Sequence, residues 1–257
     1  MTLWSAGRYD AVGTRIAGIG AQTVAAADTR RPIRGSAVVD LACGTGNAAL
    51  AAAAVGARVT GVDITPELIA IGVDKARDSG LDVTWVNADA ADTGLPEHSF
   101  DAAISNMGII FVDPQRQLAE LSRLLKPSAT LAFSSWAPIS PNPLLDPIVT
   151  VLGVPPAAGF APAQWGDPDI VAARLQAGFV DVTIDDGYLT WEFESLADAV
   201  AFVCTESPMH VDVLERLDES HRAALVTAFE SALGAQVNAA GTVSFNAPYV
   251  VVTATAR

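Results

Sequence analysis

Short apolar runs alternate along the first half of the chain with longer segments in which apolar residues recur every three or four positions. The short runs favour buried strands, whereas the longer segments have the period of helices. This alternation predicts an α/β fold with a parallel sheet covered on both faces. The expected strands are 37–41, 58–62, 83–87, 100–106 and 130–136, and the expected helices are 8–27, 47–55, 66–78 and 114–125.

The pattern changes after residue 136. Residues 137–165 are rich in proline and glycine, which interrupt regular structure. Amphipathic helices, two or three in number, are then expected within 196–233. A further helix is expected over 168–177, with strands over 179–184, 188–193 and 243–254.

The chain carries a strong negative charge. Its 257 residues include 29 acidic and 15 basic side chains, a formal net charge of −14. Such a surface repels phosphate backbones and anionic lipids, so we expect neither a nucleic acid nor a membrane as partner. Arg8 and Asp10 stand where a signal peptide would have its apolar region, and Cys43 and Cys204 lack the spacing of a disulfide framework or a zinc site. We therefore expect a cytoplasmic protein without a metal.

A glycine turn follows the first expected strand, in the sequence VVDLACGTGN at residues 38–47. Gly44 and Gly46 permit a tight turn and close approach of a ligand, and the free N–H groups of the following helix point outward. Asp63 lies 19 residues after Gly44, close to the spacing of dinucleotide-binding motifs. The turn therefore predicts a cofactor that contains a nucleoside.

Carboxylates stand at the ends of three consecutive expected strands, at Asp40, Asp63 and Asp89. Asp40 suits the ammonium group of an amino acid better than a pyrophosphate. Asp63 is placed to accept the hydroxyls of a ribose, and Asp89 the amino group of an adenine, beside the backbone N–H of Ala90. The set favours S-adenosylmethionine (SAM), a cationic nucleoside without phosphates, over NAD. As alternatives, Asp40 would cap a turn, Asp63 would cap the next helix and Asp89 would be a solvated loop residue.

These motifs together resemble the class I SAM-dependent methyltransferases of small molecules. The stretches VVDLACGTGNAAL, GVDITPELI, NADAADTGLPEHSFD, SNMGIIFVDP and LLKPSATLAFSSW follow one another in the order of that family, and WSAGRYD and QWGDPD…AGFVDV are similar to a subgroup of uncharacterised bacterial enzymes. The resemblance implies a doubly wound, mostly parallel seven-stranded Rossmann-like sheet with an antiparallel C-terminal strand and a helical insertion. It also implies a single domain over 1–257, with an N-terminal lid helix in 1–34, a SAM-binding core in 35–136 and an acceptor side in 137–257.

The resemblance also assigns roles to individual residues. The glycine turn would line the methionine part of SAM, Asp63 would hold the ribose, and Asn106 would lie beneath the sulfonium. Trp4 and Tyr9 would close over the cofactor, whose product is S-adenosyl-L-homocysteine. Ser128-Ala129 departs from the family, many members of which have Gly-Gly there. The expected cofactor-binding residues are Asp40, Ala42, Cys43, Gly44, Thr45, Gly46, Asp63, Ile64 (against the adenine), Asp89, Ala90, Asn106, Trp4 and Tyr9.

Methyl transfer from a sulfonium is an in-line displacement that requires alignment and exclusion of water, and a general base only where the acceptor must lose a proton. His210 is the one histidine considered as such a base, with a structural role as the alternative. Phe111, Trp136 and Trp165 are the candidate acceptor contacts, with packing as the alternative. We expect the acceptor pocket to form from the N-terminal helix, the 137–165 loop and the 196–233 insertion.

The aromatic and apolar character of these segments predicts a small, largely apolar acceptor that is methylated at O, N or C. Two other functions stay open on the sequence. One is an NAD(P)-dependent oxidoreductase, which is disfavoured by Asp40 and by the lack of a Tyr-x-x-x-Lys pair. The other is a SAM-binding protein without catalytic activity.

Overall fold

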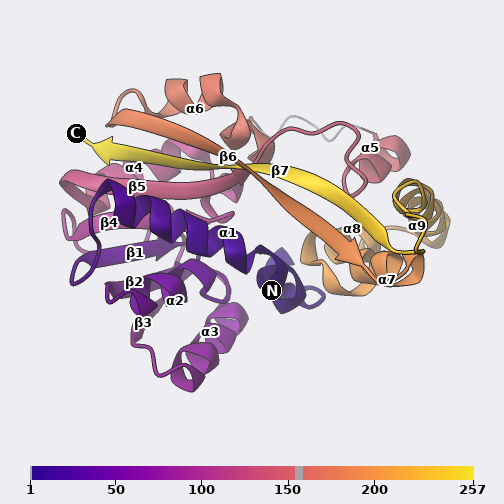
Figure 1. The fold of residues 1–257 in the computed structure, drawn as a ribbon, viewed down its shortest axis with the longest axis horizontal. Helices are drawn as coiled ribbons and strands as arrows, with labels where there is room; N and C mark the ends of the chain where they lie inside the picture. The colour runs from indigo at the N-terminus through magenta and orange to yellow at the C-terminus, as the bar shows by residue number, and fades with distance from the viewer. Residues whose placement is uncertain (1, 154–158) are drawn as a thin grey trace. The chain divides into compact units, whose positions relative to one another are not determined.

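A seven-stranded sheet forms the centre of the computed structural model, which describes residues 2–153 and 159–257 (Figure 1). The strand order is β3-β2-β1-β4-β5-β7-β6. The first five strands pair in parallel, and β7 pairs antiparallel to β5, which confirms the predicted fold class. The strands are β1 (Ala37–Leu41), β2 (Arg58–Asp63), β3 (Val83–Asn87), β4 (Phe100–Asn106), β5 (Leu125–Trp136), β6 (Phe179–Phe193) and β7 (Val243–Ala256).

The chain groups into two compact units. The core unit contains residues 16–138, 160–187 and 249–257, and the second unit contains residues 1–15, 139–159 and 188–248. The long elements α1, β6 and β7 each contribute residues to both units. The prediction of a single domain over 1–257 stays a prediction.

Helices flank the strands of the core unit along the chain. They are α1 (Tyr9–Arg30), α2 (Asn47–Ala54), α3 (Pro66–Asp78), α4 (Pro114–Leu124) and α6 (Pro168–Leu175), with 3₁₀ turns at η2 (Ile109–Phe111) and η3 (Pro162–Gly166). Parallel crossovers are right-handed, and the strand order runs outward in opposite directions from β1 and β4. The crossovers through α2 and α3 therefore cover one face of the sheet, and the crossover through α4 covers the other.

Several helices begin where the sequence predicts, at an acceptor followed by proline. Thr65 precedes Pro66 at the start of α3. Asp113 precedes Pro114 at the start of α4, and its carboxylate accepts the N–H of Arg116 at 2.9 Å. Asp113 thus satisfies a free N–H of the first turn, whereas Thr65 makes no side-chain capping bond to α3. At both starts proline has no N–H to lose.

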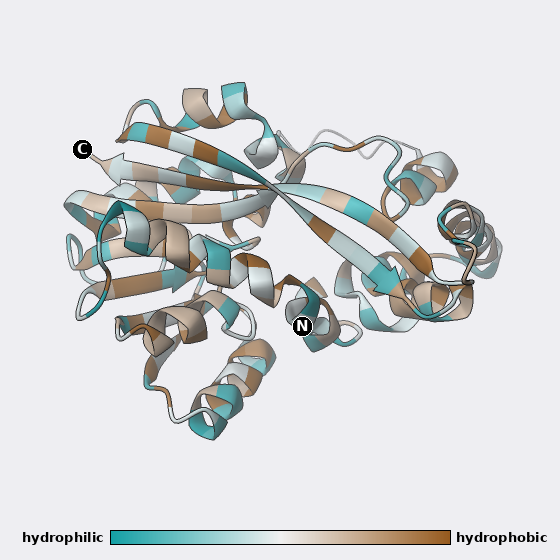
Figure 2. Ribbon diagram, viewed as in Figure 1, coloured by the Kyte–Doolittle hydropathy of each residue, from teal (hydrophilic) through white to brown (hydrophobic). Residues whose placement is uncertain are grey.

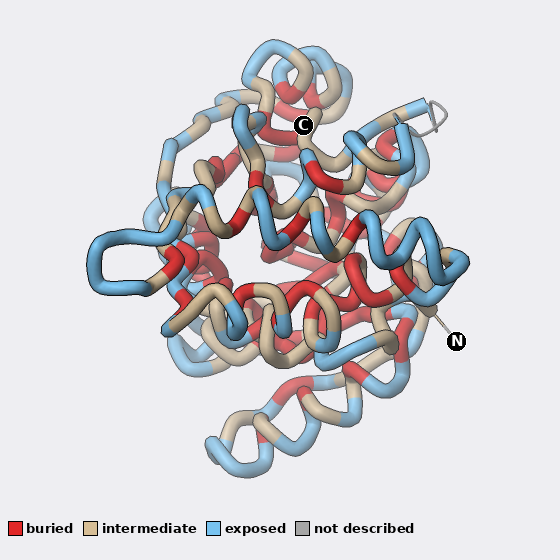
Figure 3. Tube along the Cα trace, turned by 90° about the vertical axis from the view of Figure 1, so that its right-hand side faces the viewer, coloured by how far each residue is buried: buried red, intermediate tan, exposed pale blue. Residues whose placement is uncertain are grey.

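Buried side chains concentrate in the strands. Val38, Val39 and Leu41 of β1 have no exposed surface. Figure 2 shows β1 as an apolar strand, and Figure 3 shows buried residues along the central strands with exposed residues on the surrounding helices. Strands buried on both faces carry continuous apolar runs, and this made their boundaries readable from the sequence.

Two expected boundaries are wrong. Residues 179–193 form one continuous strand, β6, where two strands were expected. Gly187 does not break the strand, because the Tyr249 ring of β7 lies where a Cβ at position 187 would stand, 2.4 Å from a ring carbon. In addition, β5 begins at Leu125, before the Lys-Pro pair, rather than at residue 130. Ser128 takes the left-handed conformation there, with φ of 63°, the conformation that Gly-Gly would favour.

The second unit is largely helical and confirms the expected helices within 196–233. Leu225, Phe229 and Leu233 line the fully buried face of its longest helix. Across residues 2–153 and 159–257, no helix is long and apolar enough to cross a bilayer. The elements of the second unit are η1 (Leu3–Ser5), α5 (Asp146–Leu152), α7 (Leu196–Ala201), the π-helical turn η4 (Phe202–Glu206), α8 (Pro208–Glu215) and α9 (Glu219–Gly234).

Candidate cofactor site

The candidate site lies at the carboxyl ends of the parallel strands of the core unit. Strand order reverses between β1 and β4, and such a reversal is where open α/β sheets bind ligands. Asp40 is paired in register with Gly61 of β2, and Asp63 with Asn87 of β3. The strands therefore bring Asp40 and Asp63 to one edge of the sheet.

The glycine turn has three residues in the left-handed conformation. Ala42, Gly44 and Gly46 have φ of 52°, 55° and 86°. Glycine adopts this conformation without cost, whereas a residue with a Cβ pays about 1–2 kcal/mol. Gly46 is the N-cap of α2, so the turn leads directly into the free N–H groups at the start of that helix.

Asp63 ties the glycine turn to the start of α3. Its Oδ2 accepts the N–H of Gly44 at 2.7 Å, and its Oδ1 accepts the N–H of Thr65 at 2.8 Å. Burial raises the pKa of Asp63, and these backbone hydrogen bonds partly offset the rise. A carboxylate oxygen can accept more than one hydrogen bond, so Asp63 retains acceptor capacity for the predicted ribose hydroxyls.

Asp40 is almost fully buried, with 1% of its surface exposed. Its Oδ2 accepts the N–H of Ala49 in the first turn of α2 at 2.8 Å. Its Oδ1 is buried and has no hydrogen-bond partner among the described residues. Burial raises the pKa of Asp40 well above its usual value, and the nearby charge of Asp63 adds to the rise. Oδ2 of Asp40 thus makes the capping contact that was the alternative to cofactor binding, and Oδ1 lacks a donor among the described residues.

Exposure differs sharply between Ile64 and its neighbours. Asp63 is 6% exposed, whereas 51% of Ile64 is open to solvent. Asp89 is half-exposed; its Oδ1 accepts the N–H of Ala91 at 2.9 Å, and its Oδ2 lies 3.1 Å from Nη2 of Arg116. The carbonyl of the buried Ala90 accepts a hydrogen bond from Gln117 at 3.2 Å. Adenine has a flat apolar face and a polar edge. The exposed side chain of Ile64 suits the face, and the carboxylate of Asp89 suits the edge.

Asn106 forms two hydrogen bonds inside the core unit. Its Nδ2 donates to the carbonyl of Ile16 in α1 at 3.2 Å, and its Oδ1 accepts the hydroxyl of Ser134 in β5 at 2.9 Å. The amide therefore joins α1, β4 and β5. The predicted position of Asn106 beneath the sulfonium stays a prediction.

Three further candidates belong to the second unit. The rings of Trp4 and Tyr9 lie edge to face with centroids 6.1 Å apart, and their lid role stays a prediction. His210 is buried, with Nδ1 2.6 Å from Oγ of Ser207 and Nε2 2.8 Å from the carbonyl of Leu144. A carbonyl only accepts, so Nε2 carries the proton. Burial lowers the pKa of His210 and keeps the ring neutral. Its role as a base stays a prediction.

The three aromatic acceptor candidates lie in the core unit. Trp165 has no exposed surface and packs edge to face on Phe133, with centroids 5.3 Å apart. The Arg174 guanidinium lies over the Trp165 ring, with its Cζ 4.6 Å from the ring centroid. Phe111 and Trp136 are half-buried. The contacts of Trp165 are those of core packing, which was the alternative for this residue.

Trp85 of β3 is a residue that the sequence analysis missed. Its ring fills a slot between three glycines from different elements. An added Cβ would lie 2.5 Å from the ring at Gly46, 2.7 Å at Gly72 and 3.0 Å at Gly61. The glycine turn thus rests on an aromatic side chain. The sequence signal that was available is a tryptophan in one expected strand, with glycines in the preceding strand, turn and helix that leave room for its ring.

The middle of the chain matches a known family. The model of a family described as "Methyltransferase domain" matches residues 39–133. An uncharacterized protein of Mycobacterium tuberculosis is 31% identical over 191 residues, which cover 73% of this chain and 69% of that protein. The chain belongs to the class I SAM-dependent methyltransferases. Demethylmenaquinone methyltransferase of Clavibacter sepedonicus is 35% identical over 141 residues, covering 53% of this methyltransferase and 56% of the relative.

Solved structures show the same fold. YcgJ protein from Bacillus subtilis has a TM-score of 0.58 at 17% identity, covering 92% of this methyltransferase and 98% of that chain. Geranyl diphosphate C-methyltransferase from Streptomyces coelicolor, in complex with S-adenosyl-L-homocysteine, has a TM-score of 0.53 at 17% identity, covering 91% and 75%. Family membership makes SAM the cofactor and disfavours the oxidoreductase alternative.

The residues at the strand ends fit SAM. The unpartnered Oδ1 of Asp40 supplies an acceptor for an ammonium group, and Asp63 retains acceptor capacity for ribose hydroxyls. The exposed Ile64 offers an apolar surface to a flat ring. Charge, hydrogen bonding and shape therefore agree with a cationic nucleoside.

Proposed function

We propose that this methyltransferase transfers the methyl group of SAM to an O, N or C atom of a small, largely apolar acceptor in the cytoplasm. The observation that carries the proposal is the strand-end arrangement of Asp40, Asp63 and Ile64. When bound, SAM supplies an activated methyl carbon: the bond from the acceptor forms as the carbon–sulfur bond breaks, and S-adenosyl-L-homocysteine leaves with that electron pair. Where the acceptor atom carries a proton, the proton passes to solvent or to a base.

The chain's own contribution is positioning. Asp63 fixes the glycine turn through Gly44 and would accept the ribose hydroxyls. Asp40 holds the start of α2 through Ala49 and would accept the ammonium group of the methionine part with its other oxygen. A site that orders its reactant before reaction removes entropy from the barrier, which is the main requirement for an in-line displacement.

The negative charge of the chain supports an acceptor that is not polyanionic, and the relatives support a small one. The net charge of −14 disfavours polyanionic acceptors such as nucleic acids. Relatives and structural neighbours are named as methyltransferases of demethylmenaquinone, phosphoethanolamine and geranyl diphosphate. All are small molecules, and they differ in chemistry, so the fold alone does not select the acceptor.

Calorimetry tests the cofactor assignment. Titration of the purified protein with SAM, S-adenosyl-L-homocysteine and NADH should give binding of the first two and none of NADH. Binding of NADH without SAM would overturn the proposal. Transfer is then measured as release of S-adenosyl-L-homocysteine with a panel of quinols, phenols and aromatic amines. Tight SAM binding with no release on any member would favour the SAM-binding protein without catalytic activity.

A further inference from the structure

Two consecutive residues of α4 contact the turn that follows β3. Nη2 of Arg116 donates to Oδ2 of Asp89 at 3.1 Å, and Nε2 of Gln117 donates to the carbonyl of Ala90 at 3.2 Å. Gln117 and Ala90 are both buried, so their hydrogen bond fixes the first turn of α4 against the turn that contains Asp89. Arg116 is thereby held beside the carboxylate of Asp89.

The place of Arg116 within its helix is locally unfavourable. α4 begins at Pro114, so Arg116 is the third helical residue, and after the cap Asp113 the first turn has no acidic side chain. The N-terminus of a helix carries partial positive charge, which favours anions and disfavours a cation there. Residues that break a local rule are expected where they serve a functional site. The carboxylate with which Arg116 pairs comes from a distant segment, at Asp89.

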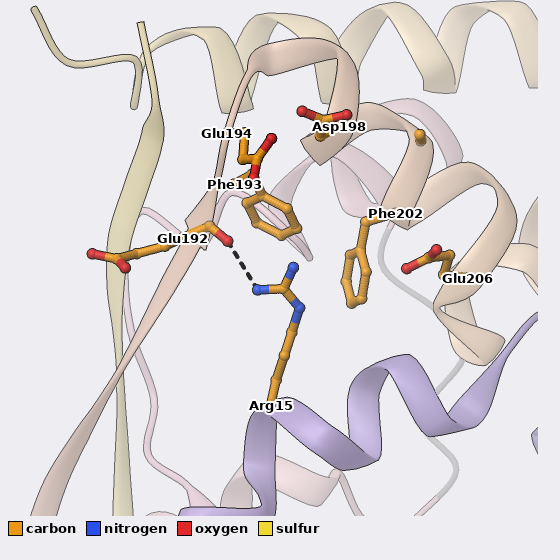
Figure 4. A pocket seen from close by; sticks show the side chains of 8 residues that line it. Arg15, Glu192, Phe193, Glu194, Asp198, Phe202 and Glu206 are labelled. Carbon is orange, nitrogen blue, oxygen red and sulfur yellow. Dashed lines mark hydrogen bonds between the residues drawn. The ribbon is translucent and has the colours of Figure 1, made fainter. Parts of the chain in front are cut away.

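A second arginine shows that nearby acidic residues do not by themselves capture a guanidinium. Arg15 lies in a pocket of the second unit that four acidic residues also line (Figure 4). Its Nη1 donates to the backbone carbonyl of Glu192 at 2.9 Å, and its Cζ lies 4.4 Å from the ring centroid of Phe193. These are packing contacts. The side chain of Arg116, in contrast, is 57% exposed and donates directly to a carboxylate oxygen.

Asp89 keeps acceptor capacity beyond its two contacts. Oδ1 accepts the N–H of Ala91 at 2.9 Å and Oδ2 accepts the bond from Arg116, whereas the two oxygens of a carboxylate offer about four lone pairs. Its side chain is 36% exposed, so a ligand can reach it. The hydrogen bonds formed within residues 2–153 and 159–257 do not use the N–H of Ala90. The turn therefore offers an acceptor beside a free donor.

This pair of groups is complementary to one edge of adenine. The 6-amino group of adenine donates hydrogen bonds, and its N1 accepts one. Hypoxanthine has the reverse pattern, a 6-oxo group that accepts and an N1–H that donates. Against hypoxanthine, the carboxylate of Asp89 and the N–H of Ala90 would both lose their partners. Polar groups left unpaired in this way are a strong basis for rejecting an analogue.

We propose that Arg116 is a positioning residue for the cofactor: its bond keeps the carboxylate of Asp89 turned toward the base and so sets the preference for a 6-amino over a 6-oxo purine. The inference rests on the proposed function, because Asp89 and Ala90 must face the adenine of SAM. Without Arg116 the Asp89 side chain is free to rotate into solvent, where it no longer selects for the amino group. Arg116 acts through Asp89 and needs no contact with SAM.

Two ligands that differ only in the base test this role. They are S-adenosyl-L-homocysteine and S-inosyl-L-homocysteine, in which hypoxanthine replaces adenine. Calorimetry on the full chain should give tighter binding of the adenosyl compound. Arg116→Met keeps an unbranched side chain but removes the donors, and because Arg116 is exposed the variant should fold. It should raise the Kd for S-adenosyl-L-homocysteine about two- to fivefold, the range expected for an ion pair between exposed side chains.

The ratio of the two Kd values separates positioning from a structural role. Arg116→Met should reduce the preference for the adenosyl compound by at least the same factor, about two- to fivefold. A structural loss would weaken both ligands equally and leave the ratio unchanged, since the ligands share every group except the base. An unchanged ratio in Arg116→Met would therefore overturn the proposal.

Arg77→Met is the matched control. Arg77 is an exposed arginine of the core unit that pairs with Asp74 and Asp78, and its replacement should leave both Kd values unchanged. The same change of ratio in this variant would contradict the role of Arg116. If the unaltered protein bound both ligands equally, the role of Arg116 would be refuted while the SAM assignment stood. Binding of neither ligand would refute the proposed function and the role of Arg116 together.

Discussion

The carboxylate of Asp63 accepts the backbone N–H of Gly44 at 2.7 Å, so the end of β2 holds the glycine turn that follows β1. The same side chain accepts the N–H of Thr65 at 2.8 Å. One buried side chain therefore fixes two backbone segments that border the predicted ribose position. The turn and the start of α3 are coupled through it.

Asp63→Asn should weaken both folding and SAM binding. An amide has only one oxygen, so its NH₂ group faces either Gly44 or Thr65 and leaves one buried N–H without an acceptor. We expect a loss of about 1–3 kcal/mol in the free energy of unfolding. We also expect a rise of about tenfold or more in the Kd for SAM, since a charge-assisted bond to the ribose is lost. Urea unfolding and calorimetry measure the two effects.

The matched control for that change is Asp82→Asn. Asp82 is exposed, so its replacement should leave both quantities within about 0.5 kcal/mol of the unaltered protein. An Asp63→Asn protein that binds SAM as tightly as the control would remove Asp63 from the cofactor site.

Asp40→Asn should stabilise the SAM-free protein at neutral pH. Burial raises the pKa of Asp40, so its ionised form costs free energy that grows as the pH rises from the ordinary aspartate range up to the raised value. An asparagine keeps an acceptor for Ala49 and removes that cost. We expect a gain of about 1–3 kcal/mol at pH 7, smaller at pH 4.

The same variant should bind SAM more weakly, because the ammonium group loses its carboxylate. In the unaltered protein the affinity for SAM should increase with pH, since binding favours the ionised form of Asp40. The asparagine variant should show a flatter pH profile in calorimetry. Identical profiles for the two proteins would place the ammonium group elsewhere.

Glu120 gives the core unit a defined acid sensitivity. Its Oε1 accepts the hydroxyl and N–H of Thr93 and lies 2.7 Å from Nη2 of Arg123. These contacts, the bond from Arg123 first, lower the pKa of Glu120 to about 2. Because the pKa of Glu120 is lowered in the folded protein, its ionised form stabilises the folded state. This stabilisation is fully present above about pH 4.5 and is lost as the pH falls towards 2.

Because the Arg123 partner is partly exposed and its charge is screened by solvent, Glu120→Gln should cost about 1–2 kcal/mol at pH 7 and much less at pH 2.5. The measurement is urea unfolding of both proteins at the two pH values. Glu215→Gln is the control, since Glu215 is exposed and should show no such pH-dependent difference. A constant difference across the range would mean that packing rather than charge is responsible.

Gly72→Ala should destabilise the protein through Trp85. The new Cβ would stand 2.7 Å from the ring, so ring or helix must shift at a cost of about 1–3 kcal/mol. Gly18→Ala is the matched control: outside the neighbouring turns of its own helix, no atom of the described residues lies within 4 Å of the added Cβ. Alanine favours a helix, so this variant should be slightly more stable. Combining Gly72→Ala with Trp85→Leu should recover part of the loss, and strictly additive effects would contradict the contact.

Much of the fold could be predicted from the sequence because its signals are local. The strands β3 and β4 have the predicted boundaries, since buried parallel strands appear as apolar runs. The start of α3 follows from its first proline, and the start of α4 follows from a capping acceptor placed before proline. Continuity of β6 was not predictable in this way, because it depends on Tyr249 filling the space beside Gly187.

The same distinction between local and long-range signals applies to the candidate site. Asp40, Asp63 and Asp89 could be nominated from the sequence because each stands at or just after the end of a recognisable strand, and their role toward the cofactor stays a prediction. The partners of Asn106 were not predictable, since the carbonyl of Ile16 is 90 residues away in the chain. Arg15 and the carbonyl of Glu192, 177 residues apart, meet only in the folded protein. Contacts between distant residues leave no periodic trace in the sequence.

An ammonium group bound at the unpartnered Oδ1 of Asp40 would link cofactor supply to the lifetime of the protein. A ligand that binds only the folded state stabilises the protein, and the stabilisation grows with the logarithm of the ratio of the ligand concentration to the Kd. When SAM is scarce, a larger fraction of the chains unfolds transiently and is open to proteolysis. The amount of this methyltransferase should therefore rise and fall with the SAM pool even at a constant rate of synthesis.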